Sequence, residues 1–208
     1  MTILVIGRPD SGKSGKAEEL AMELSEKDNR IYLATMIPYG EEGTDRVRKH
    51  RLLREGKGFL TVERPADITG IIDEEGNITV ESERTFMSEQ ENGAYPGAAP
   101  DRIKASSAVV LLECVSNLCA NEMFEVSRDS GLISSEAVVS KVTGDIRILK
   151  DKVKDLVIVT NEFETEEGFD EETVRYVNVV RKVNLRLKEL SDRIYDITEG
   201  TWKIYEDH

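Results

Sequence analysis

The sequence predicts an α/β fold in which helices cover both faces of a mainly parallel sheet. Short apolar runs alternate along the chain with longer segments whose apolar residues recur at helical spacing, and this alternation is typical of βαβ units. One run, Ala108–Leu112, is apolar throughout, as expected for a strand buried on both faces at the centre of a sheet. A glycine-rich segment, Gly7–Ser14, joins the first apolar run to the first helical pattern.

Each predicted strand is a run of about five residues bounded by polar residues or glycine, and such runs are too short for helices. The predicted strands are Thr2–Ile6, Ile31–Thr35, Phe59–Glu63, Ala108–Leu112 and Leu156–Thr160. Two further runs flank the dipeptide Glu199-Gly200, and this arrangement favours a turn between them. We therefore expect a closing hairpin formed by Arg193–Thr198 and Thr201–Tyr205.

The predicted helices carry apolar residues three or four positions apart, which places those residues on one face. They are Lys13–Ser25, the basic segment Thr44–Arg54, a segment traced from Val115 to Val126, a segment capped by Ser134 or Ser135, and Asp170–Leu190. In the fourth helix we expect the buried face to be Val138, Val139, Val142, Ile146, Leu149 and Val153. In the last helix we expect it to be Val174, Val177, Val180, Val183, Leu187 and Leu190.

A length of 208 residues with 39% hydrophobic residues suits a single domain over 1–208. The exception to the alternating pattern is the segment 71–104, which is rich in Glu, Gly, Asn and Pro and has one strand candidate, Ile78–Glu81. We interpret it as a surface insertion that forms a hairpin and has little apolar surface to bury.

The net charge of −13 argues against nucleic acid as a partner, because an acidic surface repels a phosphate backbone. No apolar run approaches the roughly 20 residues that span a bilayer, and the first run has no basic lead of the kind found in signal peptides. The two cysteines, Cys114 and Cys119, are expected to be reduced packing residues. These features indicate a cytoplasmic protein without a membrane span.

The segment after the first strand fits the pattern G-x-x-x-x-G-K-[ST] of a phosphate-binding loop. It reads Gly7-Arg8-Pro9-Asp10-Ser11-Gly12-Lys13-Ser14. In such a loop, backbone N–H groups and the start of the following helix face the phosphates. Lys13 can reach the β- and γ-phosphates, and the Ser14 hydroxyl can join the ligands of Mg²⁺. A chance match in a glycine turn is the alternative, but the strand before and the helix after it favour a loop for ATP or GTP.

An acid at the end of a neighbouring strand usually helps to hold the metal of such a loop. Glu113 follows the apolar run Val109–Leu112 and fits this role, although a polar residue that merely ends a strand is the alternative. The guanine-reading pattern N-K-x-D of signalling GTPases is absent from the sequence. Thr160-Asn161-Glu162 occupies a comparable strand end but lacks the Lys and the Asp, so a signalling GTPase is disfavoured.

The internal histidine, His50, lies in the most basic stretch of the acidic chain, Arg46–Arg54. Taken alone, such a stretch is usually a solvated helix face, and the histidine would then have no chemical role. In an enzyme that acts on phosphates, a neutral imidazole can instead attack phosphorus. The flanking Arg and Lys side chains can then neutralise the charge that develops on the phosphate oxygens.

Several segments together resemble the bifunctional adenosylcobinamide kinase / adenosylcobinamide-phosphate guanylyltransferase family of cobalamin synthesis. They are the phosphate loop, Tyr32-Leu33-Ala34-Thr35, Arg46-Val47, His50-Arg51, Thr61-Val62-Glu63-Arg64-Pro65, Leu111-Leu112-Glu113-Cys114, Asn121, Val159-Thr160-Asn161-Glu162, Val183-Asn184, Arg186-Leu187 and Asp192. The order and spacing agree over most of the chain outside the insertion. The phosphate loop is generic, whereas the His-Arg segment followed by T-V-E-x-P and L-L-[DE]-C is more specific.

The resemblance implies a RecA-like P-loop NTPase fold, a homo-oligomer with a trimer as the expected form, and two reactions in one domain. The first phosphorylates the aminopropanol hydroxyl of adenosylcobinamide, a corrinoid. The second takes GMP from GTP onto a histidine and passes it to the new phosphate; by match of motif that histidine is His50. The resemblance further places Thr35, Met36, Arg51, Leu52, Leu53 and Arg54 near the nucleotide. Glu63 and Glu113 would complete the nucleotide and Mg²⁺ site.

The sequence departs from the family pattern in the part that would frame the corrinoid. The departures are Phe163–Gly168, Tyr176-Val177-Asn178, Arg181 in place of a glycine and Leu185 in place of a Gln. Two alternatives therefore remain open. One is a kinase or guanylyltransferase with a single activity on another substrate, and the other is a nucleotide-binding module without turnover.

Overall fold

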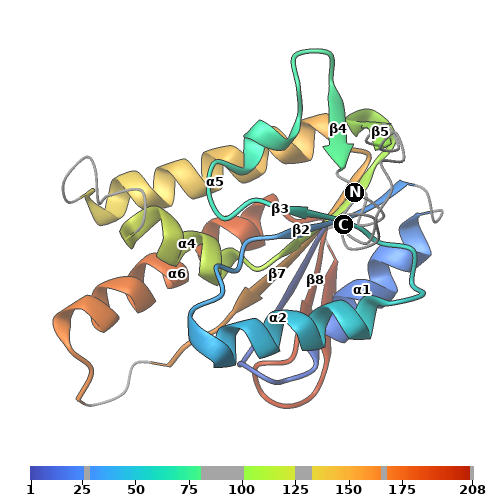
Figure 1. Cartoon of the computed structure of the whole chain (residues 1–208). Helices are drawn as coiled ribbons and strands as arrows, with labels where there is room; N and C mark the ends of the chain where they lie inside the picture. Colours follow the sequence, from blue (N-terminus) through green and yellow to red (C-terminus); the bar gives the residue numbers. More distant parts are fainter. Residues whose placement is uncertain (26–28, 81–100, 125–132, 165–167, 207–208) are drawn as a thin grey trace.

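The computed structural model describes residues 1–25, 29–80, 101–124, 133–164 and 168–206, except the side chains of Glu42, Arg46, His50 and Leu53 (Figure 1). Within these residues the main sheet has seven strands in the order β3-β2-β6-β7-β1-β8-β9. They are β1 (Thr2–Gly7), β2 (Arg30–Ala34), β3 (Leu60–Glu63), β6 (Val109–Glu113), β7 (Asp155–Asn161), β8 (Arg193–Asp196) and β9 (Lys203–Glu206). Neighbouring strands are parallel except β8 and β9, which form the predicted antiparallel hairpin. The α/β fold expected from the sequence is confirmed.

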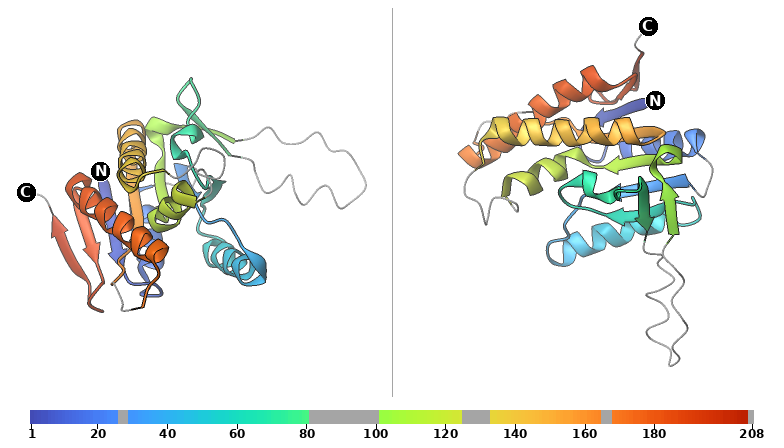
Figure 2. Two further views of the ribbon diagram at one scale, coloured as in Figure 1. Left: turned by 90° about the vertical axis from the view of Figure 1, so that its left-hand side faces the viewer. Right: turned by 90° about the horizontal axis from the view of Figure 1, so that it is seen from above.

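Helices cover both faces of the sheet. They are α1 (Lys13–Leu24), α2 (Gly40–Arg54), α4 (Val115–Phe124), α5 (Ser135–Lys152) and α6 (Glu171–Leu190). Along β1, Leu4 and Ile6 pack in the apolar cluster beneath α4, α5 and α6, whereas Ile3 and Val5 pack in the cluster beneath α1. Figure 2 shows α5 and α6 side by side on one face. Because both faces are covered, the central strands are apolar between their polar ends.

The helix caps agree with the sequence. Ser134, the first of the two candidates, caps α5, because its Oγ accepts a hydrogen bond of 3.2 Å from the N–H of Ala137. Asp170 caps α6 in the same way through Thr173. The expected inward position of Val174 is wrong, because this side chain in the first turn of α6 is 36% exposed. Val126, expected in the helix after β6, lies outside the described residues.

The helix α2 contrasts with the others, because it lies mostly in solvent. Among its residues with described side chains, only Arg54 at the C-terminal end is buried. Its Leu52 is 64% exposed. The helix begins at Gly40, four residues before the expected start at Thr44. None of the described helices is long and apolar enough to cross a membrane.

The segment 71–104 is not the purely surface insertion that its composition suggests. Its described ends form a second, antiparallel pair of strands, β4 (Asn77–Val80) and β5 (Asp101–Lys104), flanked by the short helices η2 (Ile68–Ile71) and η3 (Ala105–Ser107). Four of its apolar side chains are buried in the main core, namely Ile71, Ile72, Ile78 and Val80. The overall composition of the segment is polar, so composition alone did not indicate that these four residues are buried. Residues 81–100 lie outside the description.

The buried isoleucine of β4 gives a direct test of this packing. We expect Ile78→Ala to lower the free energy of unfolding by about 2–5 kcal/mol, because the side chain is fully buried and its loss leaves a cavity. The measurement is urea denaturation followed by circular dichroism. The matched control is Thr79→Ala, since the neighbouring side chain is exposed. Equal stability of the two variants would contradict the role of β4 in the core.

Candidate nucleotide-binding site

The phosphate loop lies where β1 meets α1, at the carboxyl edge of the parallel strands. Gly12, directly before α1, has a φ of +83°, a conformation that favours glycine. At Gly7, a Cβ atom would lie 2.5 Å from Cγ2 of Ile197 and 2.9 Å from Oγ of Ser11. The segment after β8 therefore packs directly against the loop, and only glycine fits at position 7.

The ammonium group of Lys13 lies inside the phosphate loop. Lys13 is 6% exposed, and its Nζ donates a hydrogen bond of 3.0 Å to the carbonyl oxygen of Arg8. The guanidinium of Arg8 pairs with Glu164 at the exposed rim. Lys13 thus brings positive charge to the centre of the loop, while the charge of Arg8 is compensated at its edge.

The side chains of Ser14 in α1 and Glu113 at the end of β6 are in contact. Glu113 ends β6, which β7 separates from β1, and the Ser14 hydroxyl donates a hydrogen bond of 3.0 Å to Glu113 Oε1. Burial raises the pKa of Glu113 to about 7, against the opposing effects of this hydrogen bond and of the Lys13 charge. The second oxygen, Oε2, is buried without a hydrogen-bond partner among the described residues. Hydroxyl and carboxylate oxygens are ligands that Mg²⁺ prefers, so the pair fits this ion as the sequence suggests.

Other buried polar atoms without a partner gather at the same edge. Such atoms are rare in native proteins. Among the described residues there are five, and four of them belong to the phosphate loop or to the strand ends beside it: Ser11 Oγ, Glu113 Oε2, Asn161 Oδ1 and Thr198 Oγ1. They follow β1, β6, β7 and β8, which occupy neighbouring positions in the sheet. The carboxyl edge of these strands is therefore the part of the molecule best suited to a polar ligand.

The pKa of Glu113 gives a prediction for the protein without nucleotide. A carboxyl group whose pKa is raised on folding stabilises the fold below its unfolded pKa, and this stabilisation is lost as the pH rises through the folded value. We therefore expect the free energy of unfolding to fall between about pH 5 and pH 8, partly through Glu113. Glu113→Gln should reduce this slope, whereas Glu63→Gln, which changes an exposed carboxylate, should not. Denaturation across this pH range measures it, and an unchanged slope in Glu113→Gln contradicts the assignment.

Thr35 ties two strand ends together beside this site. It is fully buried, and its Oγ1 donates to the carbonyl oxygen of Cys114 at 2.8 Å and accepts from the N–H of Cys114 at 2.9 Å. The hydroxyl is thus engaged by the backbone directly after Glu113. Met36 follows it and is half-buried. The structure brings both residues to the edge that carries Glu113.

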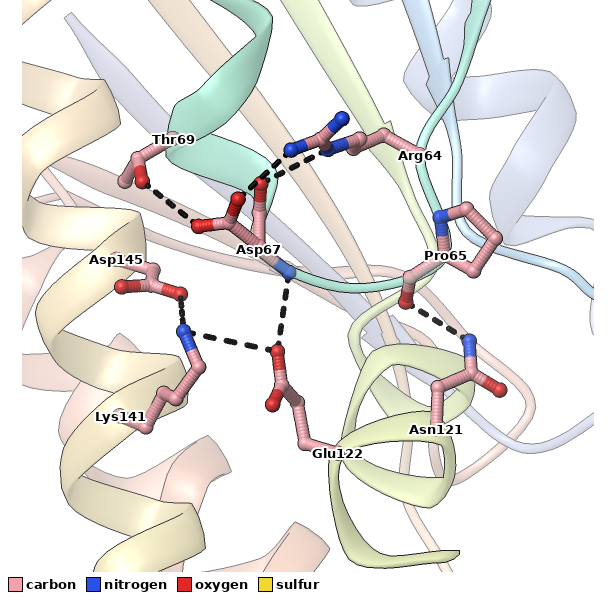
Figure 3. A network of polar contacts seen from close by, with 8 residues as sticks. All are labelled: Arg64, Pro65, Asp67, Thr69, Asn121, Glu122, Lys141 and Asp145. Carbon is pink, nitrogen blue, oxygen red and sulfur yellow. Dashed lines mark hydrogen bonds and ion pairs between the residues drawn. The ribbon is translucent and has the colours of Figure 1, made fainter. Parts of the chain in front are cut away.

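A network of polar contacts holds the chain after β3 against α4 (Figure 3). Nδ2 of Asn121 donates to the carbonyl oxygens of Thr35 and Pro65, at 2.8 and 2.9 Å. The buried carboxylate of Glu122 accepts from the N–H of Asp67 at 3.1 Å and lies 3.8 Å from Nζ of Lys141. Two consecutive residues of α4 therefore fix the place where β3 ends, and with it the position of Glu63.

The residues expected on α2 are only partly brought to the site. Arg54 is buried with its guanidinium 3.6 Å from the ring centre of Tyr32. Its charge partly opposes the effect of burial, which raises the pKa of Glu113. Arg51 pairs with Glu63 on the surface. Leu52 is exposed, and the side chains of His50 and Leu53 lie outside the described part of the chain. The C-terminal end of α2 thus lies near Glu113, whereas the rest of the helix extends into solvent.

Asn161 and Thr198 also lie at this edge, and the sequence predicts no functional role for either of them. A polar residue directly after a buried apolar run could have indicated both positions. From this pattern a metal-binding role was predicted for Glu113 alone. Residues that end parallel strands lie at one edge of the sheet, but which of them are neighbours depends on the strand order. Fold and site together define a P-loop nucleotide-binding protein of the α/β class.

A family model described as cobinamide kinase / cobinamide phosphate guanyltransferase matches residues 3–90 and 88–203. The chain therefore belongs to this family of cobalamin-synthesis enzymes, as the resemblance suggested. No curated protein matches the chain significantly in sequence.

A search of solved structures finds, among others, two similar chains. One is the flagellar accessory protein FlaH from Methanocaldococcus jannaschii, with 15% identity and a TM-score of 0.38 over 94% of this chain and 70% of FlaH. The other is an ATPase of the type III secretion system of pathogenic bacteria, with 12% identity and a TM-score of 0.52 over 95% of this chain. This chain spans 51% of that ATPase. At such identities the second likeness supports the fold alone.

Proposed function

We propose that the chain is bifunctional: it phosphorylates the hydroxyl of adenosylcobinamide and then transfers GMP from GTP to the resulting phosphate. The observation that carries the proposal is the contact of Glu113 with Ser14 of the phosphate loop, in which one buried carboxylate oxygen has no partner among the described residues. An acid in this position can hold the Mg²⁺ that phosphoryl transfer uses. Family membership supplies the substrate class.

In the kinase reaction, backbone N–H groups of residues 7–14 and the start of α1 bind the phosphates of ATP or GTP. Lys13 neutralises charge on the β- and γ-phosphates, and this charge grows as the γ-phosphoryl group is transferred. Ser14 and Glu113 would hold Mg²⁺, which would supply positive charge next to the phosphates. Arg8, Pro9, Asp10 and Ser11 shape the loop around the phosphates.

In the guanylyl transfer, an imidazole nitrogen of His50 attacks the α-phosphorus of GTP, and the bond to the leaving pyrophosphate breaks. A phosphate oxygen of the corrinoid phosphate then attacks the same phosphorus and releases the histidine. We propose that the nucleotide contacts Thr35, Met36, Arg51, Leu52, Leu53, Arg54 and Glu63. Support comes from the end of α2, where buried Arg54 lies near Glu113.

One observation favours a single-activity relative as the second candidate. A pocket of about 330 Å³ lies between α6 and the C-terminal hairpin, next to the carboxyl edge of β7 and β8. Arg181 and Leu185, two residues that depart from the family pattern, contribute to its lining. If this pocket receives part of the acceptor, the departures would change the alcohol or phosphate that is accepted.

The test is a coupled assay with adenosylcobinamide, ATP, GTP and Mg²⁺, beside controls that contain one nucleotide only. Both activities predict phosphorylated corrinoid with ATP alone and the GDP-linked product when GTP is added. Phosphorylation without the second product supports the single-activity candidate. Binding of nucleotide without either product contradicts both and favours the binding module.

We further propose that the chain acts in the cytoplasm as a homo-oligomer, with a trimer as the expected form. In support, three large side chains of the C-terminal hairpin are exposed: Trp202 (39%), Ile204 (55%) and Tyr205 (51%). Exposed apolar surface of this kind is often covered by another copy. Light scattering after size exclusion tests this, and a monomer at micromolar concentration contradicts it.

A further inference from the structure

Asn161 lies at the carboxyl edge of the sheet, beside the first residue of the phosphate loop. It ends β7, the strand that separates β1 from β6. In the register of the sheet Asn161 is opposite Gly7, the first residue of the loop, and Val159 is opposite Glu113. Neighbouring strands are about 4.8 Å apart, so Asn161 is next to Gly7 and lies two residues beyond the position opposite Glu113.

The amide of Asn161 is held in one orientation. Its Nδ2 donates a hydrogen bond of 2.6 Å to Oγ of Ser116, at the start of α4. Its backbone oxygen accepts one of 3.0 Å from Nδ2 of the buried Asn184. The next N–H, that of Glu162, donates to the carbonyl oxygen of Gly7 at 2.9 Å. The end of β7 is thus fixed to α4, to α6 and to the loop.

The other end of this amide, Oδ1, is buried without a partner among the described residues. A carbonyl oxygen can only accept hydrogen bonds, and the oxygens of an ionised phosphate also only accept. The partner of Oδ1 must therefore be a donor and cannot be the phosphate itself. Lys13, the cation of the loop, is directed to the Arg8 carbonyl inside the loop. The O–H group that attacks the γ-phosphorus is a donor that a phosphoryl transfer brings to this edge.

We propose that Oδ1 of Asn161 accepts a hydrogen bond from the attacking hydroxyl and so positions it for in-line transfer. The inference rests on the proposed kinase function. The hydroxyl oxygen forms a bond to the γ-phosphorus, and the bond from that phosphorus to the β–γ bridging oxygen breaks. The nucleoside diphosphate leaves with the electron pair, and the hydroxyl proton passes to an oxygen of the transferred phosphoryl group. When no alcohol is bound, water takes the same place and the nucleotide is hydrolysed.

The test compares Asn161→Ala with the wild type in two assays, phosphorylation of adenosylcobinamide and hydrolysis of ATP without acceptor. We expect kcat to fall about 10- to 100-fold in both assays, with the Kd of ATP within about twofold of wild type. Asn161→Asp keeps an accepting oxygen, so its kcat should exceed that of Asn161→Ala. Its added negative charge should weaken ATP binding. The matched control is Asn29→Ala, which changes a half-buried asparagine directly before β2, at the opposite edge of the sheet.

The outcomes separate this inference from the proposed function. An unchanged kcat in Asn161→Ala overturns the inference, while wild-type phosphorylation of the corrinoid leaves the proposed function standing. A fall in kcat accompanied by an equal loss of ATP binding or of folded protein assigns Asn161 a structural role and also overturns it. If the wild type hydrolyses ATP but does not phosphorylate the corrinoid, the proposed function fails. The hydrolysis assay then still decides the role of Asn161.

Discussion

Lys13→Ala is expected to lower kinase turnover by about 100- to 1000-fold and to weaken binding of ATP. The reason is the position of the ammonium group, which is 6% exposed and lies within the loop, 3.0 Å from the Arg8 carbonyl oxygen. At this position the ammonium group can stabilise the charge that develops on the phosphate oxygens during transfer. The measurement is phosphorylation of adenosylcobinamide at saturating ATP, together with the Kd of ATP.

The matched control for this variant is Lys16→Ala. Lys16 lies on the same helix, pairs with Glu19 and is 30% exposed, so its loss removes equal charge without touching the loop. The melting temperature of both variants must be recorded, because Lys13 is buried and its truncation could disturb the loop. Wild-type turnover in folded Lys13→Ala would contradict the assignment of the phosphate loop.

His50→Ala is expected to abolish GMP transfer and the covalent adduct while phosphorylation persists. The two reactions use different groups, because the kinase step needs Lys13 and the metal residues and no imidazole. The sequence has only two histidines, so His208→Ala is a complete control. Mass spectrometry after incubation with GTP measures the adduct. An adduct that survives His50→Ala would place the nucleophile elsewhere.

The chemistry of the adduct gives a second measurement on the same reaction. A phosphoramidate on histidine should be labile in acid and stable in alkali, which distinguishes it from a serine ester. Formation should fall below roughly pH 6, where an unperturbed imidazole is mostly protonated and has no free electron pair. Adduct formation that does not depend on pH would argue against an imidazole.

The fold was predictable because each element has its own local signal. The alternation of apolar runs and helical spacing defines the strands and helices, and the fully apolar β6 lies in the interior of the sheet as expected. The prediction of burial failed where a polar segment contains a few buried apolar residues, and where an apolar residue lies in an exposed turn of a helix. Ile78 and Val80 are buried although their surroundings are polar, and Val174 keeps the helical spacing but lies in the exposed first turn of α6.

The site was predictable only in part, for a different reason. The phosphate loop is one continuous motif, and Glu113 follows a run whose burial is evident. Asn161 becomes a neighbour of Gly7 only through the pairing of β7 with β1, and no spacing in the sequence encodes that pairing. The contact of Ile197 with Gly7 likewise depends on β8 lying on the other side of β1.

The position of β1 between β7 and β8 also has a consequence for synthesis of the chain. The N–H of Thr2 donates to Asp192 across 190 positions of sequence, and β7 begins at Asp155. β1 therefore leaves the ribosome long before β7, the earlier of its two sheet neighbours, and β8 follows only at Arg193. A nascent chain that stops before residue 155 has the complete phosphate loop in its sequence but neither strand that flanks it in the sheet. Because such distant pairings slow folding, nucleotide binding should appear late, as the C-terminal third emerges.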